Sequence, residues 1–294
     1  MTNHHFGGNW TDDKLERVRK YLKAYMTIFD RNEKARKLTT IYVDAFAGTG
    51  YRTQASRQPA DCPLFPELEE PETKAFLKGS ARIALEVEPP FKRYVFIERD
   101  PERAKELENL KREFQERNIE VVVTDANEYL IRWCRQNDWR YSRAVVFLDP
   151  YGMQVSWELI EALGQTKTVD LWLLFPLGMA VNRLLTTKKP PPPSWEERLT
   201  RIFGTDAWKD AFYTHHTRST LFGEEEEYYT KEADFDVIGR FFIERLKTAF
   251  RGVVEKPLPL RNSSNNPLYL LCFASGNPKG APTAIKIAQH ILST

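Results

Sequence analysis

The stretch TTIYVDAFAGTG, residues 39–50, joins a short run of β-branched and aromatic residues to a glycine-rich end. Such a run, stopping at Asp44 and followed by Gly48 and Gly50, predicts a buried strand that ends in a tight turn. Glycines in the turn let backbone amides approach a ligand, and an acid just before them can accept a hydrogen bond from an ammonium group. We therefore expect a ligand-binding loop directly after the first strand.

Four more apolar runs follow, each separated from the next by a helical pattern. They are RYVFIERD (93–100), IEVVVTDAN (119–127), SRAVVFLDPYG (142–152) and VDLWLLFPLG (169–178). Unbroken apolar strands that alternate with helices predict a parallel sheet covered on both faces. The last two runs, 252–262 and 266–275, are joined by a short polar turn and must be antiparallel. The sequence predicts a doubly wound α/β sheet of five parallel strands plus a C-terminal antiparallel hairpin.

The remaining segments are arranged around this core. The predicted units are an N-terminal helix (1–38), a core domain in two parts (39–176 and 234–294), an insertion loop (51–78) and a helical insertion (177–233). The basic residues of the first helix are expected on a solvated face, in preference to a nucleic-acid contact. They include Lys14, Arg17, Lys20 and Lys23.

Two features of the helical insertion have competing interpretations. The prolines at 190–193 are interpreted as a stiff spacer in preference to a recognition segment, and the acidic run 224–227 as a solvated loop. The adjacent His215 and His216 lack a third ligand at a suitable spacing, so we expect no metal site.

Composition excludes several classes of protein. The formal net charge is +2, from 43 Lys and Arg against 41 Asp and Glu, which is not the strongly basic balance of a protein that coats nucleic acid. Three scattered cysteines, Cys62, Cys134 and Cys272, provide neither a disulfide framework nor a zinc knuckle. No apolar run approaches the roughly 20 residues that cross a bilayer, and the first residues lack a signal-peptide pattern. We expect a cytoplasmic protein that makes no use of a membrane.

Acids end the next two predicted strands as well. Glu98 falls where α/β cofactor folds place a carboxylate for the two hydroxyls of a ribose. Asp125 could accept a hydrogen bond from an adenine amino group, with the backbone amide of Ala126 donating to the ring. A nicotinamide dinucleotide is disfavoured because Thr53 replaces the third small residue, and no Gly-Lys-Ser/Thr follows for a phosphate loop.

The fourth strand ends in Asp149-Pro150-Tyr151-Gly152. A carboxylate beside an aromatic ring can accept a hydrogen bond from an exocyclic amine and provide a face on which a planar base stacks. The alternative is a simple tight turn, because proline and glycine are turn formers. A turn does not need the acid and the ring together, so we favour a site for an acceptor amine.

The order of these features resembles the class I S-adenosylmethionine-dependent methyltransferases, a Rossmann-like family with a seven-stranded sheet. The resemblance covers most of residues 39–292 outside the insertions and implies S-adenosyl-L-methionine as cofactor. It implies a cofactor loop at Asp44, Phe46, Gly48 and Gly50, and a ribose ligand at Glu98. It also implies an adenine ligand at Asp125 with Ala126, and a substrate motif at Asp149, Pro150 and Tyr151. The chain departs from the family between Gly50 and Gly79, where typical members enter a helix directly.

A closer resemblance joins the amphipathic first helix, YVDAFAGTG (42–50), GSARIAL (79–85), VFIERD (95–100) and FLDPYG (147–152). Together they are similar to the three-Cys-motif partner (TcmP) family, whose name refers to an associated cysteine-rich protein. This resemblance implies a three-Cys-motif protein as partner. The Asp-Pro-Tyr-Gly quartet is also similar to the Asp-Pro-Phe-Gly of tRNA guanine-N2 methyltransferases, which implies an exocyclic amine of a base as acceptor.

The sequence therefore predicts an S-adenosylmethionine-dependent methyltransferase that modifies a nitrogen of a nucleic-acid base, in DNA or RNA. Asp149 would accept an N–H of the acceptor amine and Tyr151 would stack on the base. The alternative is a methyltransferase-like subunit that binds nucleic acid or a partner protein without turnover. A nuclease is disfavoured because no further cluster of carboxylates is available for a metal.

Overall fold

The structure is a computed structural model that describes residues 10–46, 72–150, 152–187, 189–219 and 225–294. Its centre is an eight-stranded sheet in the order β3-β2-β1-β4-β5-β10-β8, with β9 also paired to β10. Five strands are parallel, β1 (Thr39–Ala45), β2 (Arg93–Glu98), β3 (Ile119–Val123), β4 (Ser142–Leu148) and β5 (Val169–Phe175). The C-terminal strands are antiparallel to their neighbours, β8 (Gly252–Val253), β9 (Leu258–Arg261) and β10 (Pro267–Ser275).

This arrangement confirms the predicted Rossmann-like, doubly wound α/β fold, with one difference at the C-terminal hairpin. The run 252–262 forms two short strands, so the sheet has eight strands where seven were predicted. Pro257 lies between them and cannot donate a ladder hydrogen bond, which accounts for the interruption.

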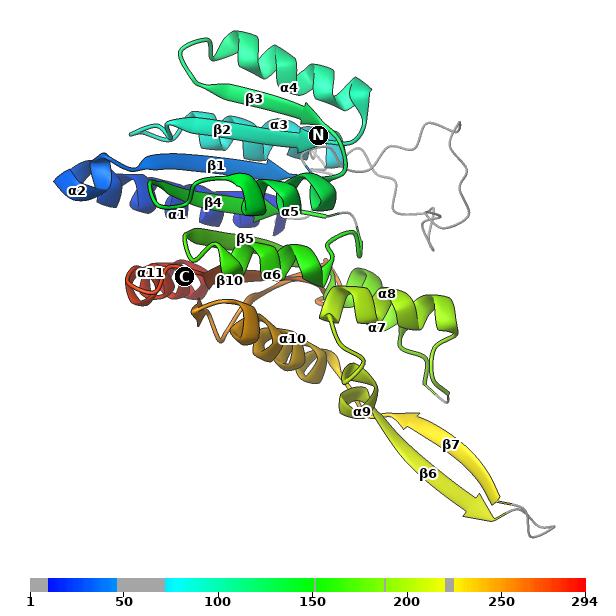
Figure 1. The fold of residues 1–294 in the computed structure, drawn as a ribbon. Coiled ribbons are helices and arrows are strands. Elements are labelled where there is room, and N and C mark those ends of the chain that lie inside the picture. Colours follow the sequence, from blue (N-terminus) through cyan, green and yellow to red (C-terminus); the bar gives the residue numbers. More distant parts are fainter. Residues whose placement is uncertain (1–9, 47–71, 151, 188, 220–224) are drawn as a thin grey trace.

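Helices cover both faces of the sheet (Figure 1). One face packs against α1 (Trp10–Arg31), α3 (Glu72–Leu85), α4 (Pro101–Glu113) and α11 (Ala281–Ser293). The other packs against α5 (Ala126–Gln136), α6 (Trp157–Gln165) and α10 (Phe235–Ala249). Within β1, Tyr42 belongs to the first core and Val43 to the second, as the alternation of side chains in a strand requires. Two buried faces explain why the strands read as unbroken apolar runs.

The first helix is part of the core, and a short helix, α2 (Glu33–Arg36), follows it. Lys14, near the start of α1, contacts Asp149 after the carboxyl end of β4, whereas Tyr21 contacts Asp170 at the start of β5. Because β4 and β5 are parallel, α1 runs from the carboxyl edge of the sheet to its amino edge. It buries an apolar stripe that includes Val18 and Leu22.

Helix α3 corrects the predicted boundary of the first insertion. It begins at Glu72, so residues 72–78 are helical where a loop to residue 78 was expected. The rest of that insertion, 51–71, lies outside the described residues.

The second insertion begins as the predicted short helices, η3 (Leu177–Val181), α7 (Asn182–Leu184), α8 (Pro193–Phe203) and α9 (Trp208–Phe212). Pro193 is the first residue of α8, and Pro190 to Pro192 precede it outside the helix, so the end of the proline run starts a helix. Proline suits this position because its missing N–H would have no partner in the first turn.

The insertion ends in an unpredicted hairpin of β6 (Tyr213–Ser219) and β7 (Glu225–Lys231). This hairpin, called the arm below, is a separate two-stranded sheet that projects from the body (Figure 1). The acidic residues Glu225 to Glu227 belong to β7, not to a loop. Sequence periodicity missed the arm because its strands have no alternating apolar face to signal them.

At its base the arm is tied to the segment that follows η3. The Tyr213 hydroxyl donates to the Thr186 carbonyl at 2.9 Å, and Lys231 Nζ donates to Asn182 Oδ1 at 2.6 Å. None of the helices in the described ranges has the length and apolar character that crossing a membrane requires.

Candidate active site

The predicted site acids follow or end four neighbouring strands at one edge of the sheet. Ala45 of β1 is aligned with Leu148 of β4 and with Ile97 of β2, and Glu98 of β2 is aligned with Val123 of β3. Along this edge the acids therefore occur in the order Asp125, Glu98, Asp44, Asp149. Three strand spacings of about 4.8 Å make the row roughly 14 Å long, which suits an elongated ligand.

The clearest unpredicted feature of this edge is a buried lysine. Lys14 of α1 is 1% exposed, and its Nζ donates to Asp149 Oδ2 at 3.0 Å. Burial lowers the pKa of Lys14, against the attraction of Asp149 and Asp44. Burial also raises the pKa of Asp149, against the attraction of Lys14. The expectation that Lys14 lies on a solvated basic face was therefore wrong, although Lys20 and Lys23 of the same helix are exposed.

Asp44 lies beside this pair with its own donors. It is 1% exposed and accepts hydrogen bonds from the Ser80 side chain on α3 and from the Tyr42 hydroxyl, the latter at 3.5 Å. Desolvation raises the pKa of Asp44 to about 7, despite these donors and Lys14. Two carboxylates and one ammonium share this corner, so it presents a surplus of negative charge when all three are ionised.

Glu98 has one oxygen that the protein leaves unused. The side chain is 3% exposed, and Oε1 accepts from the backbone amide of Asp100 at 2.7 Å. The other oxygen, Oε2, is buried and has no hydrogen-bond partner among the described residues. Desolvation is the main reason that the pKa of Glu98 rises to about 7. A buried carboxylate oxygen without a donor is costly, and this one suits a ligand hydroxyl.

Asp125 caps the helix that follows β3. Its Oδ1 accepts from the amides of Asn127 at 2.9 Å and Glu128 at 3.2 Å, so the residue has a structural role at the N-terminus of α5. Ala126 is the first residue of α5, where the backbone amide has no partner within the helix. Both capping bonds use Oδ1, so the predicted adenine contact is assigned to Oδ2.

Asn127 is a residue that sequence analysis missed. Its Nδ2 donates to the Gln154 carbonyl at 3.0 Å, and its Oδ1 accepts from the Ser156 amide at 2.9 Å. The two bonds fasten the start of α5 to the segment that follows the Asp149 motif. A buried asparagine two residues after a strand-end acid was the available signal.

The remaining predicted residues are partly outside the described ranges. Phe46 has φ of 64°, a strained value for a non-glycine residue and one often found at functional sites. Pro150 is buried, and Gly152 has φ of 71°, a value that glycine adopts readily. Gly48, Gly50 and Tyr151 lie outside the described residues.

His215 and His216 do not form a metal pair. They are adjacent in β6 and face opposite sides of the arm, where their rings lie 4.9 Å from those of Tyr229 and Tyr228. Over the described part of the chain, no group of three or more His, Cys, Asp or Glu side chains could hold a metal ion.

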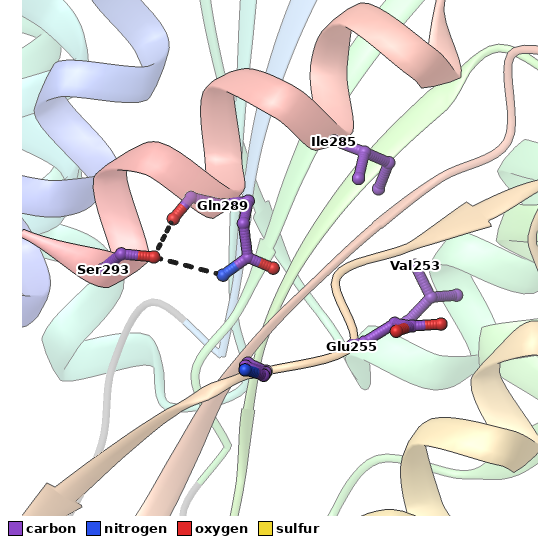
Figure 2. Close-up of a pocket in the computed structure, with 6 residues that line it drawn as sticks. Val253, Glu255, Ile285, Gln289 and Ser293 are labelled. Atoms are coloured by element: carbon purple, nitrogen blue, oxygen red, sulfur yellow. Dashed lines mark hydrogen bonds between the residues drawn. The ribbon is translucent and has the colours of Figure 1, made fainter.

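A groove of about 600 Å³ lies elsewhere, between α11 and the stretch that follows β8 (Figure 2). Its lining residues are Val253, Glu255, Lys256, Ile285, Gln289 and Ser293. The side chains of Gln289 and Ser293 bond to each other at 3.2 Å, and Glu255 pairs with Lys247 at 3.2 Å. The groove contains none of the strand-end acids, so we do not assign the site there.

Comparison with known proteins gives only distant similarities. No protein-family model and no curated protein matches the chain. Protein LPL1258 of Legionella pneumophila is 14% identical over 99% of this chain and 93% of its own, with a TM-score of 0.45. An S-adenosylmethionine-dependent methyltransferase of Clostridium acetobutylicum is 12% identical over 89% and 92%, with a TM-score of 0.37.

The N-terminal domain of EvdMO1, solved with S-adenosylhomocysteine and D-fucose, is 10% identical over 93% of this chain and 84% of its own. Its TM-score is 0.38. These scores are too low for function to be transferred, so the assignment that follows rests on the geometry of this chain.

Proposed function

We propose that the protein is an S-adenosylmethionine-dependent methyltransferase whose acceptor is an exocyclic amine of a nucleic-acid base. The observation that carries the proposal is the row of acids at the carboxyl edge, in which Oε2 of Glu98 has no hydrogen-bond partner within the described ranges. In open α/β sheets ligands bind at this edge. The cofactor supplies an electrophilic methyl group on a sulfonium.

The order of the acids supports this cofactor in particular. Asp125 with the Ala126 amide would hold the adenine, Glu98 the ribose hydroxyls and Asp44 the ammonium of the amino-acid part. These are the groups of S-adenosylmethionine in their order along the molecule, and Asp149 follows on the acceptor side. Asp44 and Glu98 both have a pKa of about 7, so a cationic or hydroxyl-bearing ligand would stabilise their ionised forms.

Asp149 is the residue proposed to position the acceptor. Lys14 Nζ donates to Oδ2 at 3.0 Å, and the proposal assigns Oδ1 to the acceptor. An N–H of the amine can donate to Oδ1, which leaves the nitrogen lone pair directed at the methyl group. Positioning of this kind can account for most of the catalysis in a transfer that needs an in-line nucleophile.

The arm supports an acceptor larger than a small molecule. It extends away from the body and carries two ring pairs, His215 with Tyr229 and His216 with Tyr228. Tyr228 is 40% exposed. Exposed rings can stack on unpaired bases, and the base of the arm is tied to the segment after β5, next to the proposed acceptor side.

A calorimetric titration with S-adenosylhomocysteine tests the cofactor, with NAD and ATP as controls. We expect selective binding that Glu98→Gln weakens by about 10- to 100-fold, because a hydrogen bond to a charged group contributes about 1.5–3 kcal/mol. Glu120→Gln on the neighbouring strand β3 is the matched control, since Glu120 already pairs with Arg93. Equal effects of the two variants, or no selective binding, would reject the cofactor site.

Transfer of labelled methyl groups into tRNA, rRNA and DNA pools tests the acceptor. The second candidate function, a methyltransferase-like subunit without turnover, is favoured by the burial of Asp149 against Lys14. Cofactor binding without transfer to any pool, including in the presence of a three-Cys-motif protein, would select that subunit. A three-Cys-motif partner itself is proposed only from the family resemblance.

A further inference from the structure

We propose that Lys14 is a positioning residue that keeps Asp149 ionised, so that Asp149 accepts a hydrogen bond from the acceptor amine instead of donating one. The proposal rests on the proposed function and assigns part of the site to the first helix of the chain. It starts from a contact between two nearly buried side chains, Lys14 Nζ and Asp149 Oδ2, 3.0 Å apart.

The protonation state of Asp149 decides what it can do. A protonated carboxyl would donate its O–H to the nitrogen lone pair and block the atom that must attack the methyl group. An ionised carboxylate can only accept, so it orients the N–H and leaves the lone pair free. Burial raises the pKa of Asp149 and so favours its protonated form, and a nearby cation opposes that shift.

The surroundings identify Lys14 as that cation. The charged and titratable groups that act on the pair include Asp44 and Tyr42 of β1, and Asp44 is a second acid that would oppose ionisation of Asp149. Lys14 Nζ also lies over the Phe147 ring of β4, 6.0 Å from the ring centroid, a cation–π contact that favours the ammonium at this position. The next lysine of α1, Lys20, is 55% exposed and lies only within 3.9 Å of Glu16.

Thermal unfolding of the ligand-free full chain at pH 6 and pH 9 tests the pairing. Lys14→Met leaves the buried carboxylate of Asp149 with a raised pKa. The unfolding temperature of this variant therefore falls relative to wild type as pH increases. Asp149→Asn leaves a buried ammonium with a lowered pKa, so its midpoint increases relative to wild type over the same range. The double variant and the control Lys20→Met are expected to follow the wild-type slope.

Opposite slopes for the two single variants support the pairing, and slopes parallel to wild type overturn it. If Lys14→Met does not fold, the slope of Asp149→Asn alone decides, because the lysine then remains without its partner.

The pH profile of methyl transfer tests positioning against a merely structural role. In Lys14→Met the acid limb moves to higher pH, because Asp149 then ionises only there, whereas a structural role lowers the rate equally at every pH. Opposite stability slopes with an unmoved acid limb would overturn the positioning role. If wild type binds no S-adenosylhomocysteine and transfers no methyl group, the proposed function fails, and the stability slopes still decide the pairing.

Discussion

Helix α1 contacts a buried carboxylate at each end of the sheet, and the two ends differ in how those carboxylates are satisfied. At the amino edge Asp170 accepts from the Tyr21 hydroxyl at 2.7 Å and from the Ser275 hydroxyl at 2.5 Å. At the carboxyl edge Lys14 pairs with one oxygen of Asp149, and Glu98 nearby has a buried oxygen with no donor in the described part of the chain. The first arrangement uses both oxygens of Asp170, and the second leaves acceptors for a ligand.

The difference teaches how to separate structural from functional acids in a sheet of this kind. A carboxylate whose two oxygens both accept hydrogen bonds from neutral donors stabilises the fold and has no oxygen available to a ligand. Burial raises the pKa of Asp170 too, to about 6, so the pKa shift does not separate the two edges. The distinguishing feature is an unused oxygen, which costs stability and is a common property of binding sites. Substitutions at the two edges are therefore expected to act in opposite directions.

The largest effect is expected from Asp170→Ala. It would leave the hydroxyls of Tyr21 and Ser275 buried without an acceptor, so the free energy of unfolding should fall by about 3–5 kcal/mol. Urea unfolding measures this loss. Affinity for S-adenosylhomocysteine should remain within about twofold of wild type wherever the variant is folded, and a large loss of affinity would remove the proposed distinction between the two edges.

Asp44→Asn is expected to act the other way. The pKa of Asp44 is about 7 in the folded protein, above its value in the unfolded chain. The folded state therefore loses stability as the pH rises from the unfolded-state pKa toward 7, and the asparagine of the variant, which does not ionise, avoids this loss. At pH 8 the variant should gain of the order of 2 kcal/mol in urea unfolding and lose about tenfold in affinity for S-adenosylmethionine. A variant that loses stability, or binds as tightly as wild type, would contradict the assignment.

The origin of these two edges shows what the sequence could reveal. The strands were predictable because each is buried on both faces, and the acids because each follows an apolar run directly. Lys14 was missed although it lies on the apolar stripe of its helix, four residues before Val18 and seven before Tyr21. A charged residue at a core position of an amphipathic pattern was the signal, and only the fold shows that Asp149 is its partner.

The arm could not be predicted for a different reason. Its strands, YTHHTRS and EEEYYTK, are mostly polar, and their pairing depends on cross-strand contacts such as His216 with Tyr228. Hydrophobic periodicity reports burial in a core, and the arm contributes little to one.

A smaller effect is expected from pH on cofactor affinity. Asp44 and Glu98 ionise near pH 7. At pH 6 both carboxyls are mostly protonated and must lose their protons when the ligand binds, whereas at pH 8 they are already ionised. Affinity for S-adenosylmethionine should fall by up to about tenfold between pH 8 and pH 6 for each carboxyl that must ionise, so the fall should be smaller in Asp44→Asn. Calorimetry in buffers of different ionisation enthalpy would detect the released protons. A flat profile in wild type would mean that neither carboxyl meets the ligand.

The smallest effect separates two tyrosines on one helix. Tyr21→Phe removes one of the two donors to Asp170, and we expect a loss of about 1 kcal/mol in urea unfolding. Tyr25→Phe is the matched control, because Tyr25 is buried beside the same acid and makes no hydrogen bond to it within the described residues. Tyr25→Phe should therefore cost less. Equal losses in the free energy of unfolding would indicate that the hydrogen bond of the Tyr21 hydroxyl contributes nothing beyond the packing of its ring. The aromatic rings alone would then stabilise the amino edge.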